Sequence, residues 1–278
     1  MKKLLFSIIA LFMMLQGAYA ATKKQTYSAL VAEGEAYLRD EQYAQGIENY
    51  KKAIDIIPEQ SIAHLELAGA YIQSELYGLA EEQYLEVLRL DRKSFDANFL
   101  LGSLYLKLGR NSDAMEYFQK ALTIKSDIKL YKQIAVCAKN EGDIELSIAM
   151  CKRVISAQQD YDVLLDLGNL YQYQRKEIEA EESFSQAIKL DQNRSEAYFY
   201  IGILYLENGD FTRAENILKI VAEKTPEDAL VHFFLANIFF QQNNIPSAKS
   251  ELRLAKSLSK SKMLSLYTDK FSDFLSRQ

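Results

Sequence analysis

Glycine and proline are scarce in this chain, with 11 Gly and 3 Pro among 278 residues. An all-β sandwich or barrel needs many tight turns, and these two residues supply much of the turn chemistry. Good helix formers, namely Ala, Leu, Glu, Lys and Gln, dominate instead. Apolar residues make up 49% of the chain, which is enough to bury a core. The composition therefore predicts an ordered all-α protein.

Residue types that carry catalysis and metal binding are also rare. The chain has two histidines, His64 and His232, and two cysteines, Cys137 and Cys151. It contains no Cys-x-x-Cys, His-Glu-x-x-His or Gly-x-Ser-x-Gly motif, no Gly-rich phosphate loop and no EF-hand loop. Both histidines fall on the same position of the repeat described below, which favours a packing role. We therefore expect no enzyme activity, no metal site and no cofactor.

The chain has no excess of positive charge: its formal net charge is -5, so the protein is acidic. An acidic protein is repelled by nucleic acid and by acidic lipid. We expect no nucleic-acid partner.

The N-terminus has the pattern of a signal peptide. Lys2 and Lys3 precede an apolar run over residues 4–15, and a small-residue site ends at Ala20. The run is shorter than the roughly 20 apolar residues of a spanning helix. We predict a signal peptide over residues 1–20, cleavage after Ala20, a secreted or periplasmic location and no integral membrane segment after cleavage. An uncleaved anchor is the alternative.

The main signal is an internal repeat with a period of 33 or 34 residues. In six of the seven units a small residue stands three positions before a large one, as in Gly102 and Tyr105, and a second small residue stands four positions before another large one, as in Ala114 and Phe118. The fourth unit is weaker, with Ala138 and Cys151 at the positions of the large residues. The small residues let two helices approach closely, and the rings fill the adjoining gaps. Seven units are predicted, over residues 27–60, 61–94, 95–127, 128–160, 161–194, 195–228 and 229–262.

This order of residues at this period resembles the tetratricopeptide repeat (TPR) family, and the resemblance covers nearly all of residues 27–262. It implies an all-α fold, a right-handed α-solenoid of about seven helix-turn-helix repeats. Residues 263–278 keep one apolar stripe and are predicted to form a C-terminal capping helix.

In the TPR family the first helices line the concave surface, and the resemblance assigns positions two, five, nine and twelve of each unit to it. The apolar members would anchor a partner, the lysines would form a basic spot, and the asparagines would hold a peptide backbone. Packing between neighbouring first helices is the alternative role for any single ring. The partner-binding residues predicted in this way are Leu65, Phe99, Lys129, Lys132, Lys139, Leu165, Asn169, Phe199, Phe233, Asn237 and Phe240.

These features together predict a non-catalytic protein-protein interaction scaffold or adaptor in the cell envelope, with a peptide or protein partner in the concave groove. Two alternatives remain open: a small-ligand or glycan binder that uses the same groove, and an accessory subunit of an envelope enzyme. Cys137 and Cys151 both belong to the fourth unit. An oxidising compartment would allow a disulfide between them, and two buried thiols are the other reading.

Overall fold

The computed structural model describes residues 2–277, with side chains from residue 13 onward. No strand occurs between residues 2 and 277, so the all-α prediction is confirmed. The chain divides into two compact units, one ending at Gly142 and the other starting at Asp143. This boundary falls inside the fourth predicted repeat, between its two helices.

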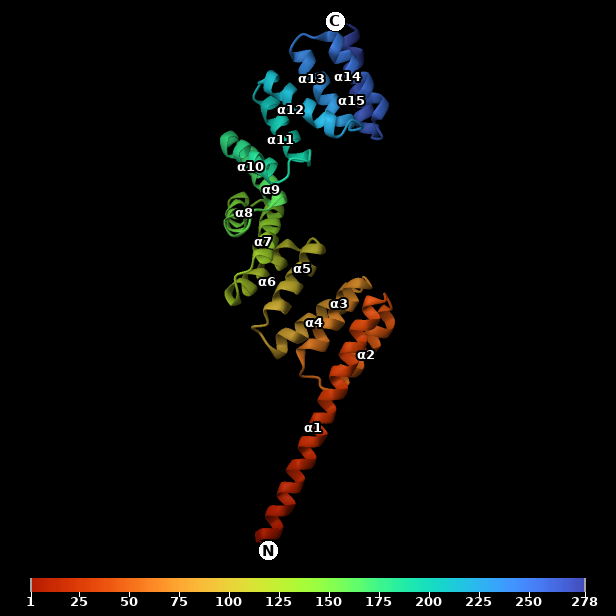
Figure 1. The fold of residues 1–278 in the computed structure, drawn as a ribbon, viewed down its shortest axis with the longest axis vertical. Helices are drawn as coiled ribbons and strands as arrows, with labels where there is room; N and C mark the ends of the chain where they lie inside the picture. Colours follow the sequence, from red (N-terminus) through yellow and green to blue (C-terminus); the bar gives the residue numbers. More distant parts are fainter. Residues whose placement is uncertain (1, 278) are drawn as a thin grey trace. The chain divides into compact units, whose positions relative to one another are not determined.

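The first unit consists of helices that pack in consecutive antiparallel pairs (Figure 1), α3 against α4 and α5 against α6. Its helices are α1 (Lys2–Arg39), α2 (Tyr43–Ile56), α3 (Ser61–Gln73), α4 (Tyr77–Leu90), α5 (Phe95–Lys107), α6 (Asn111–Ile124) and α7 (Ile128–Glu141).

The second unit repeats the same pairing, α9 with α10, α11 with α12 and α13 with α14, and a single helix, α15, packs on α14 at its end. Its helices are α8 (Ile144–Ala157), α9 (Tyr161–Tyr173), α10 (Glu177–Leu190), α11 (Glu196–Glu207), α12 (Phe211–Lys224), α13 (Ala229–Gln241), α14 (Ile245–Leu258) and α15 (Lys262–Ser276).

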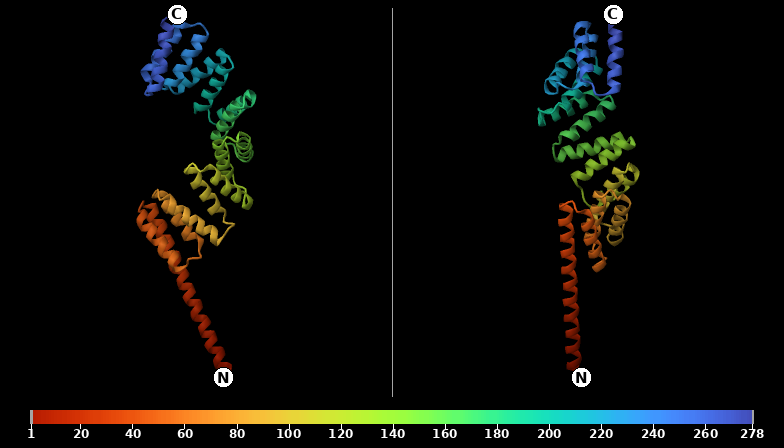
Figure 2. Two further views of the ribbon diagram at one scale, coloured as in Figure 1. Left: turned by 180° about the vertical axis from the view of Figure 1, so that it is seen from behind. Right: turned by 90° about the vertical axis from the view of Figure 1, so that its right-hand side faces the viewer.

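Helix α1 is much longer than the other helices of its unit. Its C-terminal half pairs with α2, whereas its N-terminal half runs past α2 alone, as both views of Figure 2 show. The side chains of residues 13–26 are exposed, and burial begins at Tyr27. The segment predicted as a signal peptide therefore continues without a break into the first repeat helix. Among the described residues, no helix combines the length and the apolar character that crossing a bilayer requires.

Small residues on the first helices leave room for large side chains of the second helices. A Cβ atom on Gly102 would lie 2.7 Å from two carbons of the Phe118 ring, and one on Gly202 would lie 2.5 Å from Leu218. Phe118 and Leu218 are both fully buried. The small and large residues of one repeat thus meet across the helix pair, which is the close approach that the repeat pattern predicts.

The turns within helix pairs use left-handed backbone and side-chain caps. Gly109, Gly142 and Gly209 have φ between 73° and 81°, a conformation that favours glycine. The Asp143 carboxylate accepts a hydrogen bond from the Leu146 N–H at 3.0 Å at the start of α8. These contacts end one helix and start the next within a few residues.

The two histidines connect helices and are buried. In the second repeat His64 Nδ1 lies 2.8 Å from Gln83 Oε1 on α4, and its Nε2 lies 3.0 Å from the Pro58 carbonyl oxygen. In the seventh repeat His232 Nδ1 lies 2.7 Å from Glu251 Oε2 on α14. We call this contact between the first and second helix of a repeat the histidine bridge.

Cys137 on α7 and Cys151 on α8 are both buried. Burial raises the pKa of the Cys137 thiol to about 11, so its nucleophilic thiolate is rare at neutral pH.

Candidate functional site

The apolar groove residues predicted in the first unit are half-buried. Leu65 lies on α3 and Phe99 on α5. The Phe99 ring stacks on Phe95, with centroids 5.9 Å apart, and contacts the Phe118 ring at 6.0 Å. Phe99 therefore already has aromatic neighbours on α5 and α6, and only part of its ring remains for a partner.

The predicted basic spot lies on α7, the last helix of the first unit. Lys129 and Lys139 are exposed and Lys132 is half-buried. The Lys129 N–H donates a hydrogen bond to the carboxylate of Asp127, which caps the helix at 2.8 Å. This cap fixes the start of the helix that carries all three ammonium groups.

Aromatic rings form a continuous cluster over α11, α13 and α15 in the second unit. Phe199 meets Phe234 edge to face at 5.7 Å, and Phe234 meets Phe233 at 5.9 Å. Phe271 of the terminal helix then contacts Phe233 at 6.2 Å and Phe240 at 5.6 Å. Two predicted anchors, Phe233 and Phe240, thus pack against the capping helix.

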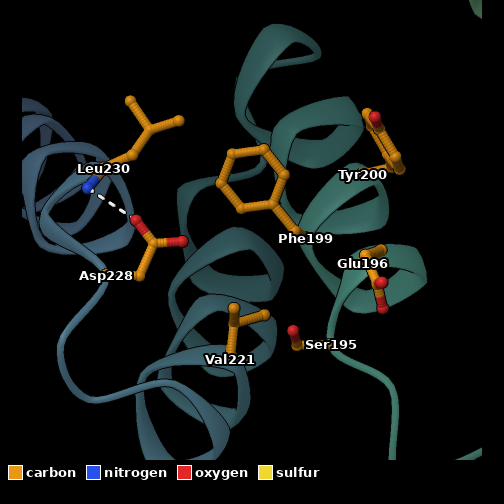
Figure 3. A pocket seen from close by; sticks show the side chains of 7 residues that line it. All are labelled: Ser195, Glu196, Phe199, Tyr200, Val221, Asp228 and Leu230. Atoms are coloured by element: carbon orange, nitrogen blue, oxygen red, sulfur yellow. Dashed lines mark hydrogen bonds between the residues drawn. The ribbon is translucent and has the colours of Figure 1, made fainter.

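Phe199 lies at the other end of this cluster and lines a pocket of about 150 Å³. Figure 3 shows its ring between Leu230 and Asp228 on one side and Tyr200 and Glu196 on the other. The Tyr200 ring stacks on Phe184, with centroids 5.4 Å apart. We call this hollow the Phe199 pocket; its lining residues are Ser195, Glu196, Phe199, Tyr200, Val221, Asp228 and Leu230.

Two carboxylates stand beside the apolar lining of the Phe199 pocket. Asp228 accepts a hydrogen bond from the Leu230 N–H at 2.9 Å and so caps α13. Glu196 pairs with the Arg194 guanidinium at 3.1 Å, and this hydrogen bond lowers the pKa of Glu196. The pocket therefore combines a rigid aromatic wall with an acidic rim.

The remaining predicted residues have local neighbours. Leu165 is half-buried and packs against the buried cluster of α9, α10 and α11 that contains Tyr161. Asn169 is half-buried on α9. The Asn237 side-chain oxygen accepts a long hydrogen bond of 3.5 Å from Gln241.

Several lining residues of the Phe199 pocket were missed by sequence reasoning. Glu196 and Leu230 stand at the second position of their repeats, so the positional rule that selected Phe199 could have found them. Val221 comes from the second helix α12, and Ser195 precedes α11. No periodic rule for first helices covers these two residues.

The pocket has the features of a recognition site for one side chain. Its volume is below the roughly 300–1,000 Å³ of typical small-molecule sites. Within residues 2–277, no group of three or more His, Cys, Asp or Glu side chains could hold a metal ion.

Two family models described as tetratricopeptide repeat match the chain, one over residues 31–94 and 65–127 and the other over residues 173–238 and 205–260. Together these matches cover more than half of the chain.

Curated relatives are distant and much longer. The protein O-mannosyl-transferase TMTC3 of Homo sapiens is 26% identical over 64% of this chain, and the chain spans 20% of its length. Anaphase-promoting complex subunit 3 of Schizosaccharomyces pombe is 24% identical over 78% of this chain, which spans 28% of that protein.

Solved structures share the fold at low identity. The C-terminal part of a TPR repeat-containing protein from Cytophaga hutchinsonii matches with a TM-score of 0.73 at 18% identity, over 84% of this chain and 97% of that chain. A tetratricopeptide repeat protein from Parabacteroides merdae matches with a TM-score of 0.62 at 15% identity, over 91% of this chain and 99% of that chain.

Proposed function

The chain belongs to the tetratricopeptide repeat family, and on that premise we propose that it is a non-catalytic scaffold that binds a peptide segment of a partner protein at the Phe199 pocket. Proteins of this fold typically mediate protein-protein interactions. The partner would present one apolar side chain to the pocket and a polar or basic neighbour to the rim.

The observation that carries the proposal is the pocket itself. Phe199, Val221 and Leu230 supply apolar surface from three helices, and about 150 Å³ suits one side chain. A buried apolar anchor in such a pocket commonly carries a large share of binding energy. A glycan or small ligand as a whole would need a larger cavity.

Affinity capture with two matched variants tests the proposal. Leu230 lines the pocket and is 40% exposed, and Leu254 on α14 is also 40% exposed but lies outside the pocket. We expect Leu230→Glu to lose a partner that the unmodified chain captures from an extract of the producing cells, because it places a charge at the pocket wall. Leu254→Glu should retain that partner.

Retention of the partner by Leu230→Glu, at the level of Leu254→Glu, would move the binding site away from the Phe199 pocket. Failure of the unmodified chain to capture any partner that survives washing would contradict the scaffold function itself. Circular dichroism of both variants controls for folding.

We further propose that the protein acts in the cell envelope after export. The support is the Lys2 and Lys3 pair, the apolar run that follows it and the small-residue site at Ala20. The intact mass of the protein purified from its own cells tests this. A chain that starts at Ala21 is expected, and a full-length chain in the cytoplasm would refute export.

A further inference from the structure

A second hollow lies in the second unit, between helices α8 and α10 and over α9. Its volume is about 360 Å³, which is more than twice that of the Phe199 pocket. Ile155, Leu164 and Leu167 form its floor, and Lys152, Glu179 and Glu182 are on its rim. We call it the α8–α10 cleft.

The cleft lies at the place where the second and seventh repeats have the histidine bridge, which the fifth repeat lacks. The position of the bridging histidine is Leu164 there, and the position of its partner, Gln83 or Glu251 in the bridged repeats, is Ser183. The short Ser183 hydroxyl donates to the Glu179 carbonyl oxygen at 2.7 Å and so stays on its own helix. Leu164 and Ser183 both line the cleft.

Other repeats place more side-chain volume at these two positions. The pairs are Leu30 and Asn49 in the first repeat, Asn98 and Tyr117 in the third, Tyr131 and Met150 in the fourth, and Tyr198 and Ile217 in the sixth. Only the fifth repeat combines an aliphatic residue with serine. Protein interiors are otherwise close-packed, so small side chains at these two positions of the fifth repeat leave a cleft there.

The rim of the cleft carries an excess of negative charge. Lys152 is the only cation among the lining residues, and its ammonium lies over the Tyr171 ring, 5.5 Å from the centroid. Glu179 and Glu182 form no salt bridge within the part of the chain that the structure describes, and Glu182 also borders a further hollow of about 380 Å³ on the same helix, α10.

We infer that the α8–α10 cleft is a second docking site, which takes an aliphatic side chain of a protein segment with basic residues beside it. The aliphatic group covers the floor at Ile155 and Leu167, and the basic residues approach Glu179 and Glu182. This site differs from the Phe199 pocket because second helices form its walls. A chain with both sites can hold two segments at once, which raises the avidity for a partner that carries both.

The test uses methyl-labelled full chain and two short peptides of defined composition. Both have a central leucine, which lysines flank in one peptide and glutamates in the other. We expect the lysine peptide to shift the methyl signals of Ile155 and Leu164 and to bind about tenfold or more tightly than the glutamate peptide. Binding of both peptides alike, shifts confined to Leu230, or no binding would overturn the inference.

Two variants check the assignment. Leu164→His with Ser183→Gln transplants the histidine bridge into the fifth repeat and fills the cleft, so lysine-peptide affinity should fall about tenfold or more. Glu179→Lys with Glu182→Lys changes only exposed side chains and should reverse the peptide preference. Unchanged affinity in a folded bridge variant, or unchanged preference in the lysine variant, would refute the site. Leu230→Glu should leave this binding intact, which separates the cleft from the proposed function.

Discussion

At the scale of single residues, glycine sets how closely the two helices of a repeat approach. Gly102 faces the fully buried Phe118 ring, whereas Gly69 on α3 has no side-chain or tertiary neighbour within 4 Å of an added Cβ. Both are helical glycines, so they share the same intrinsic cost in a helix. The two glycines therefore differ in their tertiary contacts and not in their helix propensity.

Alanine substitution separates these two glycines. We expect Gly102→Ala to destabilise the protein by about 1–3 kcal/mol, because the new methyl group displaces the Phe118 ring. Gly69→Ala should stabilise it by about 0.5–1 kcal/mol through helix propensity alone. Urea unfolding monitored by circular dichroism measures both. Equal effects of the two substitutions would contradict a tertiary role for Gly102.

At the scale of helices, two first helices obtain their N-terminal cap from the preceding repeat. The residues before α3 and α11, Gln60 and Ser195, provide no side-chain cap. The Tyr161 hydroxyl instead accepts a hydrogen bond from the Ala197 N–H of α11 at 3.1 Å, and Tyr27 caps α3 in the same way. These tyrosines couple neighbouring repeats by satisfying a helix end.

The cap predicts a loss of stability in Tyr161→Phe of about 1 kcal/mol, because the Ala197 N–H loses its acceptor. Tyr50→Phe is the matched control. The Tyr50 hydroxyl is buried and has no hydrogen-bond partner in the described structure, so its removal should be neutral or stabilising. Thermal unfolding of both variants decides the point, and a Tyr161→Phe variant as stable as the parent would remove the capping role.

At the scale of the whole molecule, stability in a repeat array comes from each repeat and its contacts with its neighbours. The fourth repeat is the weakest match to the pattern, because Cys151 replaces the ring that Phe118 and Phe184 supply in neighbouring repeats. The division between the two compact units also falls in this repeat, after Gly142.

Hydrogen exchange under native conditions tests where the array opens. We expect the amides of α7 and α8 to exchange faster than those of α5, α6, α9 and α10, because fewer large side chains stabilise the fourth repeat. Gly102→Ala, placed in the third repeat, should extend fast exchange to α5 and α6. Protection of α7 and α8 equal to the best-protected helices would contradict the proposed weak point.

The sequence by itself determined the all-α fold and the pairing of small with large residues, because both depend on spacing within one or two helical turns. It also selected Phe199, which lines the Phe199 pocket, since every first helix presents the same positions. Only the tertiary structure decided that Phe233 and Phe240 pack against Phe271 of α15, and that Tyr161 caps α11. Such contacts join different structural units, and the residue spacing within one repeat does not specify them. The α8–α10 cleft also depends on the tertiary structure. A repeat that lacks the histidine bridge has a hollow at this place only where the neighbouring helices leave the space unfilled.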